Sequence, residues 1–346
     1  MTTHATRNGG LSPAAYLLFA AALAAALLLG ICLGSVPVAP GETFRALAAA
    51  LRGTGGDGAG AYSIVVTLRL PRVLCVALMG ASLSLCGGAM QGLLRNPLAD
   101  GSTLGVSSGA ALGAAVAIAF GVSIPGLPGA GAAGTAMLSA FLSLVFILTL
   151  AYRLDASLST NTILLLGVVF SLFTGSLLSL VITFAGSRLR PLLFWTMGSL
   201  SGSGYGDALA LALALLLCGG TILFFSRELD AFSLGEPSAR HVGVDVRRTK
   251  LIVLVAVSAL IGICVSIGGS IGFVGLVVPH MARMLFGPSH RRLLPASLFG
   301  GATFLLLADL ASRVVLAPLE LPIGVVTSLI GSVVFVRIFY LTRKAE

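Results

Sequence analysis

The chain has 346 residues, of which 57% are hydrophobic and only 10% are charged. Soluble domains carry about 25% charged residues, so this composition excludes an ordinary water-soluble domain and indicates a protein surrounded by membrane lipid. The formal net charge of +9 does not indicate nucleic-acid binding, because the basic residues lie between apolar runs and form no basic face interleaved with aromatic residues.

Ten apolar segments follow one another along the chain. The first, residues 14–34, has about 20 residues, which is enough to span a bilayer. Because more such segments follow, we interpret it as a transmembrane helix and not as a signal peptide. The others are residues 70–94, 103–120, 133–152, 160–185, 207–226, 250–267, 273–286, 293–316 and 321–341. No linker divides them, so residues 1–346 are predicted to form a single all-α integral membrane domain.

The distribution of basic residues predicts the orientation of the chain in the membrane. If the N-terminus is cytoplasmic, 14 of the 21 lysine and arginine residues fall on the cytoplasmic side of the ten segments and 7 on the outer side. Cytoplasmic loops carry the excess of positive charge in membrane proteins. Both termini are therefore expected in the cytoplasm.

Glycine and other small residues are patterned along the apolar segments. They recur every four positions at Gly80, Ser84 and Gly88, and again at Gly105, Gly109 and Gly113. This spacing predicts close packing between membrane helices. The glycine-rich stretch 266–280, with Pro279 near its end, instead predicts a break in a helix, which is consistent with a transport pathway.

The sequence contains little that could perform catalysis. None of its four histidines lies at metal-ligand spacing from another ligand, and its five cysteines lie in apolar runs without metal or redox spacing. Neither lysine, Lys250 or Lys344, follows a glycine as in a P-loop. The chain is therefore not expected to be an enzyme or to bind a metal or cofactor, and any ATP would be bound by another subunit.

Two polar positions lie inside the apolar segments. Asp309 is deep in the ninth segment, and Arg313 follows one helical turn later, so we expect them to form an i, i+4 ion pair. The alternative is that Asp309 is a proton site of a secondary transporter driven by an ion gradient. Gln91, in the second segment, is expected to hydrogen-bond between helices.

Four stretches of the chain contain distinctive motifs. They are residues 69–110, 234–246, 271–283 and 305–324, with RLPR at Arg69 to Arg72, NPLAD from Asn96 and Pro97, VVPH at Pro279 and His280, and ELPIG from Glu320. These stretches resemble the permease subunits of type II ATP-binding-cassette (ABC) importers for ferric siderophores, haem and cobalamin. That family has ten transmembrane helices, and the resemblance covers nearly the whole chain. The chain departs from the family at Gly101 and between Gly331 and Phe335, where the family usually has a proline.

The resemblance implies roles for polar residues at both membrane surfaces. Arg69, Arg72 and Arg313 would contact carboxylates of a periplasmic binding protein, although arginines at such positions can also extend toward the interface without a partner. The cytoplasmic loop 227–250 would be the coupling loop that docks on the ATPase, although a charged loop is usually only solvated. Its docking residues would be Leu234, Gly235, Glu236, Ala239, Arg240 and Gly243.

The fifth segment would line the substrate pathway, with Ser159 and Thr160 at its inner gate. Ser and Thr also favour helix N-caps, and both readings can hold together. The resemblance further implies a homodimer with two ATPase subunits, which bind ATP and Mg²⁺, in the bacterial inner membrane. The cargo remains open between an iron chelate, haem and cobalamin. A secondary transporter and a membrane scaffold without transport remain the alternatives.

Overall fold

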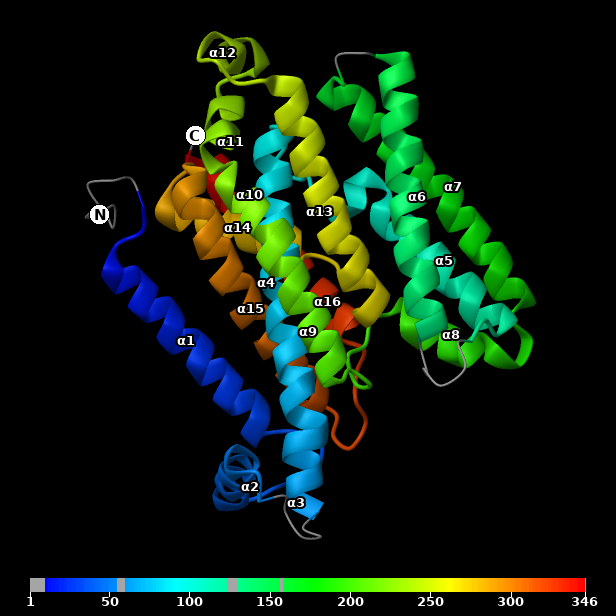
Figure 1. The fold of residues 1–346 in the computed structure, drawn as a ribbon. Coiled ribbons are helices and arrows are strands. Elements are labelled where there is room, and N and C mark those ends of the chain that lie inside the picture. Colours follow the sequence, from blue (N-terminus) through cyan, green and yellow to red (C-terminus); the bar gives the residue numbers. More distant parts are fainter. Residues whose placement is uncertain (1–9, 55–59, 124–129, 156–157, 346) are drawn as a thin grey trace.

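The computed structural model describes residues 10–54, 60–123, 130–155 and 158–345, which form a bundle of helices (Figure 1). Among these residues, seven helical spans are long and apolar enough to cross a membrane. They are α1 (Pro13–Cys32), Gly60–Leu93, α6 (Ala130–Leu154), α7 (Thr160–Phe184), Tyr205–Phe224, α13 (Val246–Gly268) and α15 (His290–Val314). Two shorter apolar helices are α5 (Val106–Phe120) and α14 (Val274–Phe286), and α16 (Ile323–Ala345) has a shorter apolar part, Ile323–Ile338. These ten correspond to the ten predicted segments.

Helix α4 (Leu70–Leu93) lies at the centre of the bundle and packs against α9 (Tyr205–Ala214), α13, α14 and α15. A Cβ atom on Gly80 of α4 would collide with the backbone carbonyl of Gly301 in α15. A Cβ atom on Gly109 of α5 would likewise collide with Ser143 of α6. The predicted close packing through small residues is therefore confirmed in both helix pairs.

The second membrane span begins ten residues before its predicted start. A short helix α3 (Gly60–Tyr62) and a π-helical segment η1 (Ser63–Arg69) precede α4 without interruption. The amide of Leu70 donates to the carbonyl of Val65, five residues earlier. The next residue, Pro71, has no N–H to donate. This wide turn at the start of α4 brings Arg69 into the protein, where it is buried.

Helix α2 (Pro40–Arg52) was not predicted from the sequence. Pro40 stands at its first position, where no amide is needed, and Gly53 ends it at φ +65°. The helix is short and carries charged residues, so it gives no long apolar run. It lies at the end of the bundle opposite α12 (Glu236–His241) (Figure 1).

The predicted helix break after residue 267 is confirmed. Helix α13 ends at Gly268, the backbone passes through φ +69° at Gly269 and φ +68° at Phe273, and α14 begins at Val274. The amide of Ser199 donates to the carbonyl of Gly268 at 2.9 Å. The irregular backbone lines a cavity of about 400 Å³ beside α4. Non-helical backbone of this kind is tolerated at membrane depth where protein or a cavity surrounds it.

The last helix, α16, is continuous from Ile323 to Ala345. The helix is thus unbroken in the region of Gly331, where the family usually has a proline. Gly331 allows the side chain of Phe273 to approach the helix closely. The remaining short helices are η2 (Gly101–Leu104), η3 (Gly186–Arg188), α8 (Leu189–Thr196), η4 (Leu215–Gly219), α10 (Gly220–Phe224) and α11 (Ser226–Ser233).

The start of α1 and the end of α16 lie at the same end of the bundle as α11 and α12 (Figure 1). Helix α2 and the connection between α15 and α16 lie at the other end. We refer to these as the α12 end and the α2 end. The start of the first described span and the end of the last therefore lie on one side of the bundle, which agrees with the arrangement expected from the sequence.

Candidate functional site

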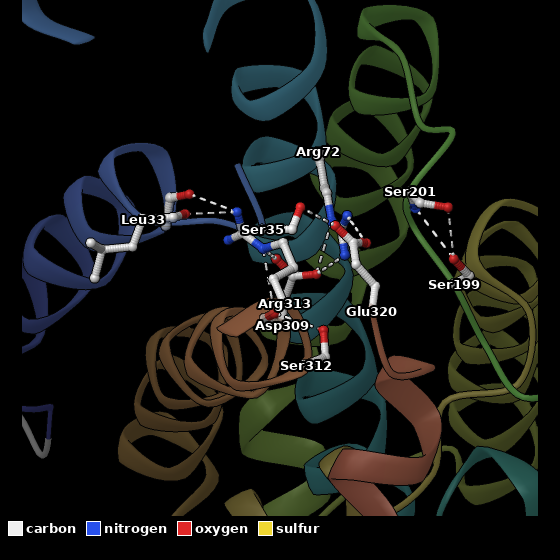
Figure 2. Close-up of polar contacts among 10 residues, drawn as sticks. Leu33, Ser35, Arg72, Ser199, Ser201, Asp309, Ser312, Arg313 and Glu320 are labelled. Atoms are coloured by element: carbon white, nitrogen blue, oxygen red, sulfur yellow. Dashed lines mark hydrogen bonds and ion pairs between the residues drawn. The ribbon is translucent and has the colours of Figure 1, made fainter. Parts of the chain in front are cut away.

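At the α2 end, Asp309 is the centre of a buried ion-pair cluster (Figure 2). Its carboxylate is fully buried and lies 2.9 Å from Nε of Arg313, which confirms the predicted i, i+4 pair. It also lies 2.9 Å from the guanidinium of Arg72 on α4. Arg72 reaches onward to Glu320 at 2.8 Å, and the hydroxyl of Ser35 donates to Glu320 at 3.0 Å. The cluster therefore joins α4, α15 and the segments that follow α1 and α15.

Two of the predicted docking arginines bind backbone carbonyls at the end of α1. Arg313 Nη1 donates to the carbonyls of Gly30 and Leu33, at 3.0 Å each. Arg69 donates to the carbonyls of Ile31 at 2.9 Å and Cys32 at 3.0 Å, and to that of Val36. The last carbonyls of a helix lack partners within the helix. Both side chains therefore cap α1. They do not extend toward the membrane interface without a partner, which was the alternative left open by the sequence.

Arg69, Arg72 and Arg313 nevertheless line one cleft of about 190 Å³ together with Glu320. Three guanidinium groups face two carboxylates here, those of Asp309 and Glu320, so the cluster retains one positive charge. Although burial on its own raises the pKa of Glu320, the hydrogen bond and charge of Arg72 lower it below the usual value. An arginine-lined cleft with excess positive charge can accept one further carboxylate.

At the α12 end, the predicted coupling residues lie on α12 and directly on either side of it. Gly235, at φ +107°, reverses the chain so that Glu236 begins the helix. Ala239 is fully buried against the bundle, while Arg240 faces outward. Gly243, at φ +87°, lies within the connection between α12 and α13 and is exposed.

Apolar side chains flank α12 without being covered. Leu234, before the helix, is 76% exposed, and Val242, after it, is 70% exposed. Leu234 lies between α11 and α12, and Val242 directly follows α12, so both are outside the seven long apolar spans. Exposed apolar side chains around a projecting helix are typical of a protein–protein contact.

Ser159 and Thr160, the predicted gate residues, stand at the start of α7. The hydroxyl of Ser159 accepts from the amide of Thr162 at 3.4 Å, so Ser159 is the N-cap that the sequence also predicted. The buried hydroxyl of Thr160 has no hydrogen-bond partner in the structure. Leu158, before them, takes φ +53°, which makes a sharp turn directly before the helix.

Helix α7 is the least covered span among the described residues, with 11% of its most apolar window buried. Its half nearer the α2 end exposes the hydroxyls of Ser176, Ser179 and Thr183. Each of them donates to the carbonyl four residues earlier at 2.9–3.1 Å. The exposed face is thus apolar with a few satisfied polar groups, and carries no charge within the helix.

The other motif residues serve the packing of the bundle. Gln91 donates to the carbonyls of Gly275 at 3.3 Å and Leu276 at 3.2 Å, which confirms the predicted hydrogen bond between helices. Asn96 and the exposed Pro97 form the turn after α4, in which the Asn96 side chain accepts from the Leu98 amide at 2.9 Å.

Two further motif residues lie in α14. Pro279 is buried inside the helix, and the ring of His280 packs against that of Phe335 in α16 at 6.1 Å. All five cysteines are free, and no three of the described His, Cys, Asp and Glu residues lie close enough together to hold a metal ion.

Two polar links at the α12 end were not predicted. The Asp230 carboxylate, on α11, accepts from the His290 amide at 2.6 Å, pairs with His290 Nδ1 at 2.8 Å and accepts from Ser289 at 3.0 Å. Burial alone would raise the pKa of Asp230, but these hydrogen bonds outweigh it and lower the pKa. The second link is Lys250, which is fully buried and binds Glu236 and the carbonyl of Leu158. Partners so distant in the sequence leave no periodic signal.

Comparison with known proteins agrees with this architecture. Residues 22–344 match the FecCD transport family. The chain is 42% identical to the ABC transporter permease protein YvrB of Bacillus subtilis, over 94% of this chain and 93% of that protein. It is 40% identical to the cobalamin import system permease protein BtuC of Halobacterium salinarum, over 83% of this chain and 75% of that protein. A solved inward-facing structure of a metal-chelate type ABC transporter superposes with a TM-score of 0.83 at 30% identity, covering 95% of this chain and 99% of that one.

Proposed function

Because the chain belongs to the FecCD transport family, we propose that it is the membrane-spanning permease subunit of an ATP-driven importer for an iron chelate or cobalamin. Residues 1–346 would form one permease domain in a bacterial inner membrane, with both termini in the cytoplasm. The observation that carries the proposal is helix α12, which projects at the end of the bundle shared by both chain ends and is flanked by uncovered apolar side chains.

The α12 end would bind the ATPase. ATP and Mg²⁺ would be held by two ATPase subunits, and none by this chain. Leu234 and Val242, on either side of α12, supply apolar surface for a groove of the ATPase, and the exposed Arg240 supplies a charge at its rim. Residues at the buried centre of an interface carry most of its binding energy.

Co-purification of the permease with its ATPase tests this contact. Leu234→Glu with Val242→Glu would place charges in the apolar contact, so we expect at least a tenfold loss of retained ATPase. Phe44→Glu, on the exposed face of α2 at the opposite end, is the matched control and should retain the ATPase. Equal retention in all three proteins would refute the docking site.

The pathway would run along α7, between this chain and a second copy. The exposed face of α7, the least buried of the described spans, needs either lipid or a partner, and a second copy of this chain would cover it. A weakly polar wall without charges suits a bulky chelate that is released by gating. It does not suit a bare ion, which requires a ring of ligands.

The arginine-lined cleft at the α2 end would receive a carboxylate of the periplasmic binding protein. Its excess of one positive charge supports this role, because complementary rim charges steer docking. Reversal of Arg69 or Arg313 would be a poor test, since both also hold the end of α1. Arg72, whose partners are Asp309 and Glu320 and not the end of α1, and Glu320, whose side chain is 32% exposed, allow a cleaner one.

The test compares two variants that each replace a charged side chain by neutral glutamine, one removing a negative charge and the other a positive charge. Glu320→Gln leaves the cleft with one more positive charge and should tighten binding-protein association severalfold at low salt, whereas Arg72→Gln removes the excess and should weaken it. The thermal unfolding midpoint of each variant is measured as well, so that a loss of binding can be distinguished from a loss of folding. If both variants changed the affinity in the same direction, or neither changed it, the docking assignment would be wrong.

The cargo follows from the relatives only as a class. One relative carries the name of a cobalamin permease, and the solved structure is of a metal-chelate type transporter. Cobalamin and iron chelates share bulk and low charge density, which the α7 face suits. The alternative of an ion-gradient-driven transporter depends on Asp309, which lies 2.9 Å from both Arg72 and Arg313.

A further inference from the structure

Lys250 is a buried cation that joins three separate parts of the chain. It lies in the second turn of α13 and is fully buried. Its ammonium group donates to the carbonyl of Leu158 at 2.8 Å and to the carboxylate of Glu236 at 2.6 Å. Burial of an ammonium group costs free energy unless charge and hydrogen bonds compensate it. An apolar side chain would fill the same space without that cost, so packing alone does not explain the lysine.

The two partners of Lys250 belong to the parts that the proposed function assigns to coupling and gating. Glu236 is the first residue of α12, which would dock on the ATPase. Leu158 directly precedes Ser159, the N-cap of α7. The α12 helix and the start of α7 therefore share one buried ammonium group, although Glu236 and Leu158 are far apart in the sequence.

Leu158 is itself held in place by hydrogen bonds to Asp155. The Leu158 amide donates to the carbonyl of Asp155 at 2.9 Å, and the Ser159 amide donates to the Asp155 carboxylate at 3.2 Å. Leu158 is also buried in the same apolar core as Ala239 of α12. A displacement of Leu158 would therefore carry Ser159 and the first turn of α7 with it.

We propose that Lys250 is a positioning residue that transmits movement of α12 to the start of α7, and so couples the ATPase to the inner gate. This inference rests on the proposed function. Apolar contacts between the two parts can slide, whereas the ammonium group holds Glu236 and the Leu158 carbonyl at fixed distances. Without this link, the ATPase would move α12 while the gate followed poorly.

The experiment measures uptake and ATP hydrolysis together in proteoliposomes that hold the permease with its ATPase and binding protein. Haem, a ferric siderophore and cobalamin are offered in parallel, and the cargo that wild type imports is used for the variants. Lys250→Met keeps the unbranched stem of the side chain and removes the ammonium group with its charge. We expect ATP hydrolysis within about twofold of wild type and a loss of about tenfold or more in cargo imported per ATP. Arg153→Met removes an exposed cation near the same turn and should leave that ratio unchanged.

A second variant separates the link from general stability. Glu236→Gln should lower cargo imported per ATP less than Lys250→Met, because the glutamine oxygen still accepts from the ammonium group. The double variant should be no worse than Lys250→Met alone, since residues that act as one unit are not additive. Uptake and hydrolysis falling in parallel with the amount of folded protein would overturn the inference, as would an unchanged ratio. A wild-type assembly that imports none of the three probes with ATP would instead overturn the proposed function, and this inference with it.

Discussion

The replacement Asp309→Asn tests the buried cluster that holds the α2 end together. Asp309 is fully buried and is the shared partner of Arg72 and Arg313, each at 2.9 Å. Asparagine has nearly the same shape, so the change removes the charge and leaves the packing. The side chains of the two arginines are only 11% and 3% exposed, so water does not replace the lost carboxylate.

The magnitude follows from what each arginine retains. Loss of one member of a buried ion pair costs about 3–5 kcal/mol. Arg72 keeps Glu320 at 2.8 Å, and Arg313 keeps the carbonyls of Gly30 and Leu33 at 3.0 Å each. We therefore expect the low end of that range, about 3 kcal/mol, which is roughly a hundredfold in the ratio of folded to unfolded protein.

Thermal unfolding of the purified chain in detergent, followed by loss of the monodisperse peak, provides the measurement. Glu42→Gln is the matched control, because it removes an exposed carboxylate from α2 and should change stability by less than about 0.5 kcal/mol. If Asp309→Asn unfolded at the wild-type midpoint, the structural role of this cluster would be refuted. Full stability together with abolished transport would instead favour the secondary transporter.

Two further predictions concern packing and pH. Gly301→Val would force a side chain against the backbone of Gly80 and should lower the free energy of unfolding by about 2 kcal/mol or more. Gly134→Ala, which has open space around it, should keep the wild-type unfolding midpoint. Equal midpoints for the two variants would contradict the close packing of α4 on α15. Because the pKa of Asp230 is lowered in the folded protein, its stabilisation is complete above about pH 4 and is lost as the pH falls through the folded-state value. Asp230→Asn should make the unfolding midpoint depend less on pH in that window. An unchanged dependence on pH would contradict the role of the His290 contact.

The ten apolar segments and the break after residue 267 could be predicted because hydropathy and glycine density are local properties of the sequence. The Asp309–Arg313 pair could be predicted for the same reason, since both residues lie on one helix. The start of the second span could not, because the buried Arg69 interrupts the apolar run although carbonyls of α1 satisfy it. Helix α2 was missed because it is short and amphipathic.

The contacts that define the candidate sites join residues far apart in the chain. Arg72 meets Asp309, which is 237 residues away, and Lys250 meets Leu158, which is 92 residues away. No spacing rule relates such positions, so the sequence indicated Arg69 and Arg72 without their partners. It gave no reason to choose Lys250, whose role depends on the fold bringing α12 and α7 together.

Uptake into proteoliposomes tests the central claim most directly. The vesicles hold this chain with its ATPase and with ATP inside, and the binding protein is outside with haem, a ferric siderophore or cobalamin. The account predicts uptake of one of these that requires both ATP and the binding protein. Uptake driven by an imposed proton gradient, without ATP or the ATPase, would contradict it.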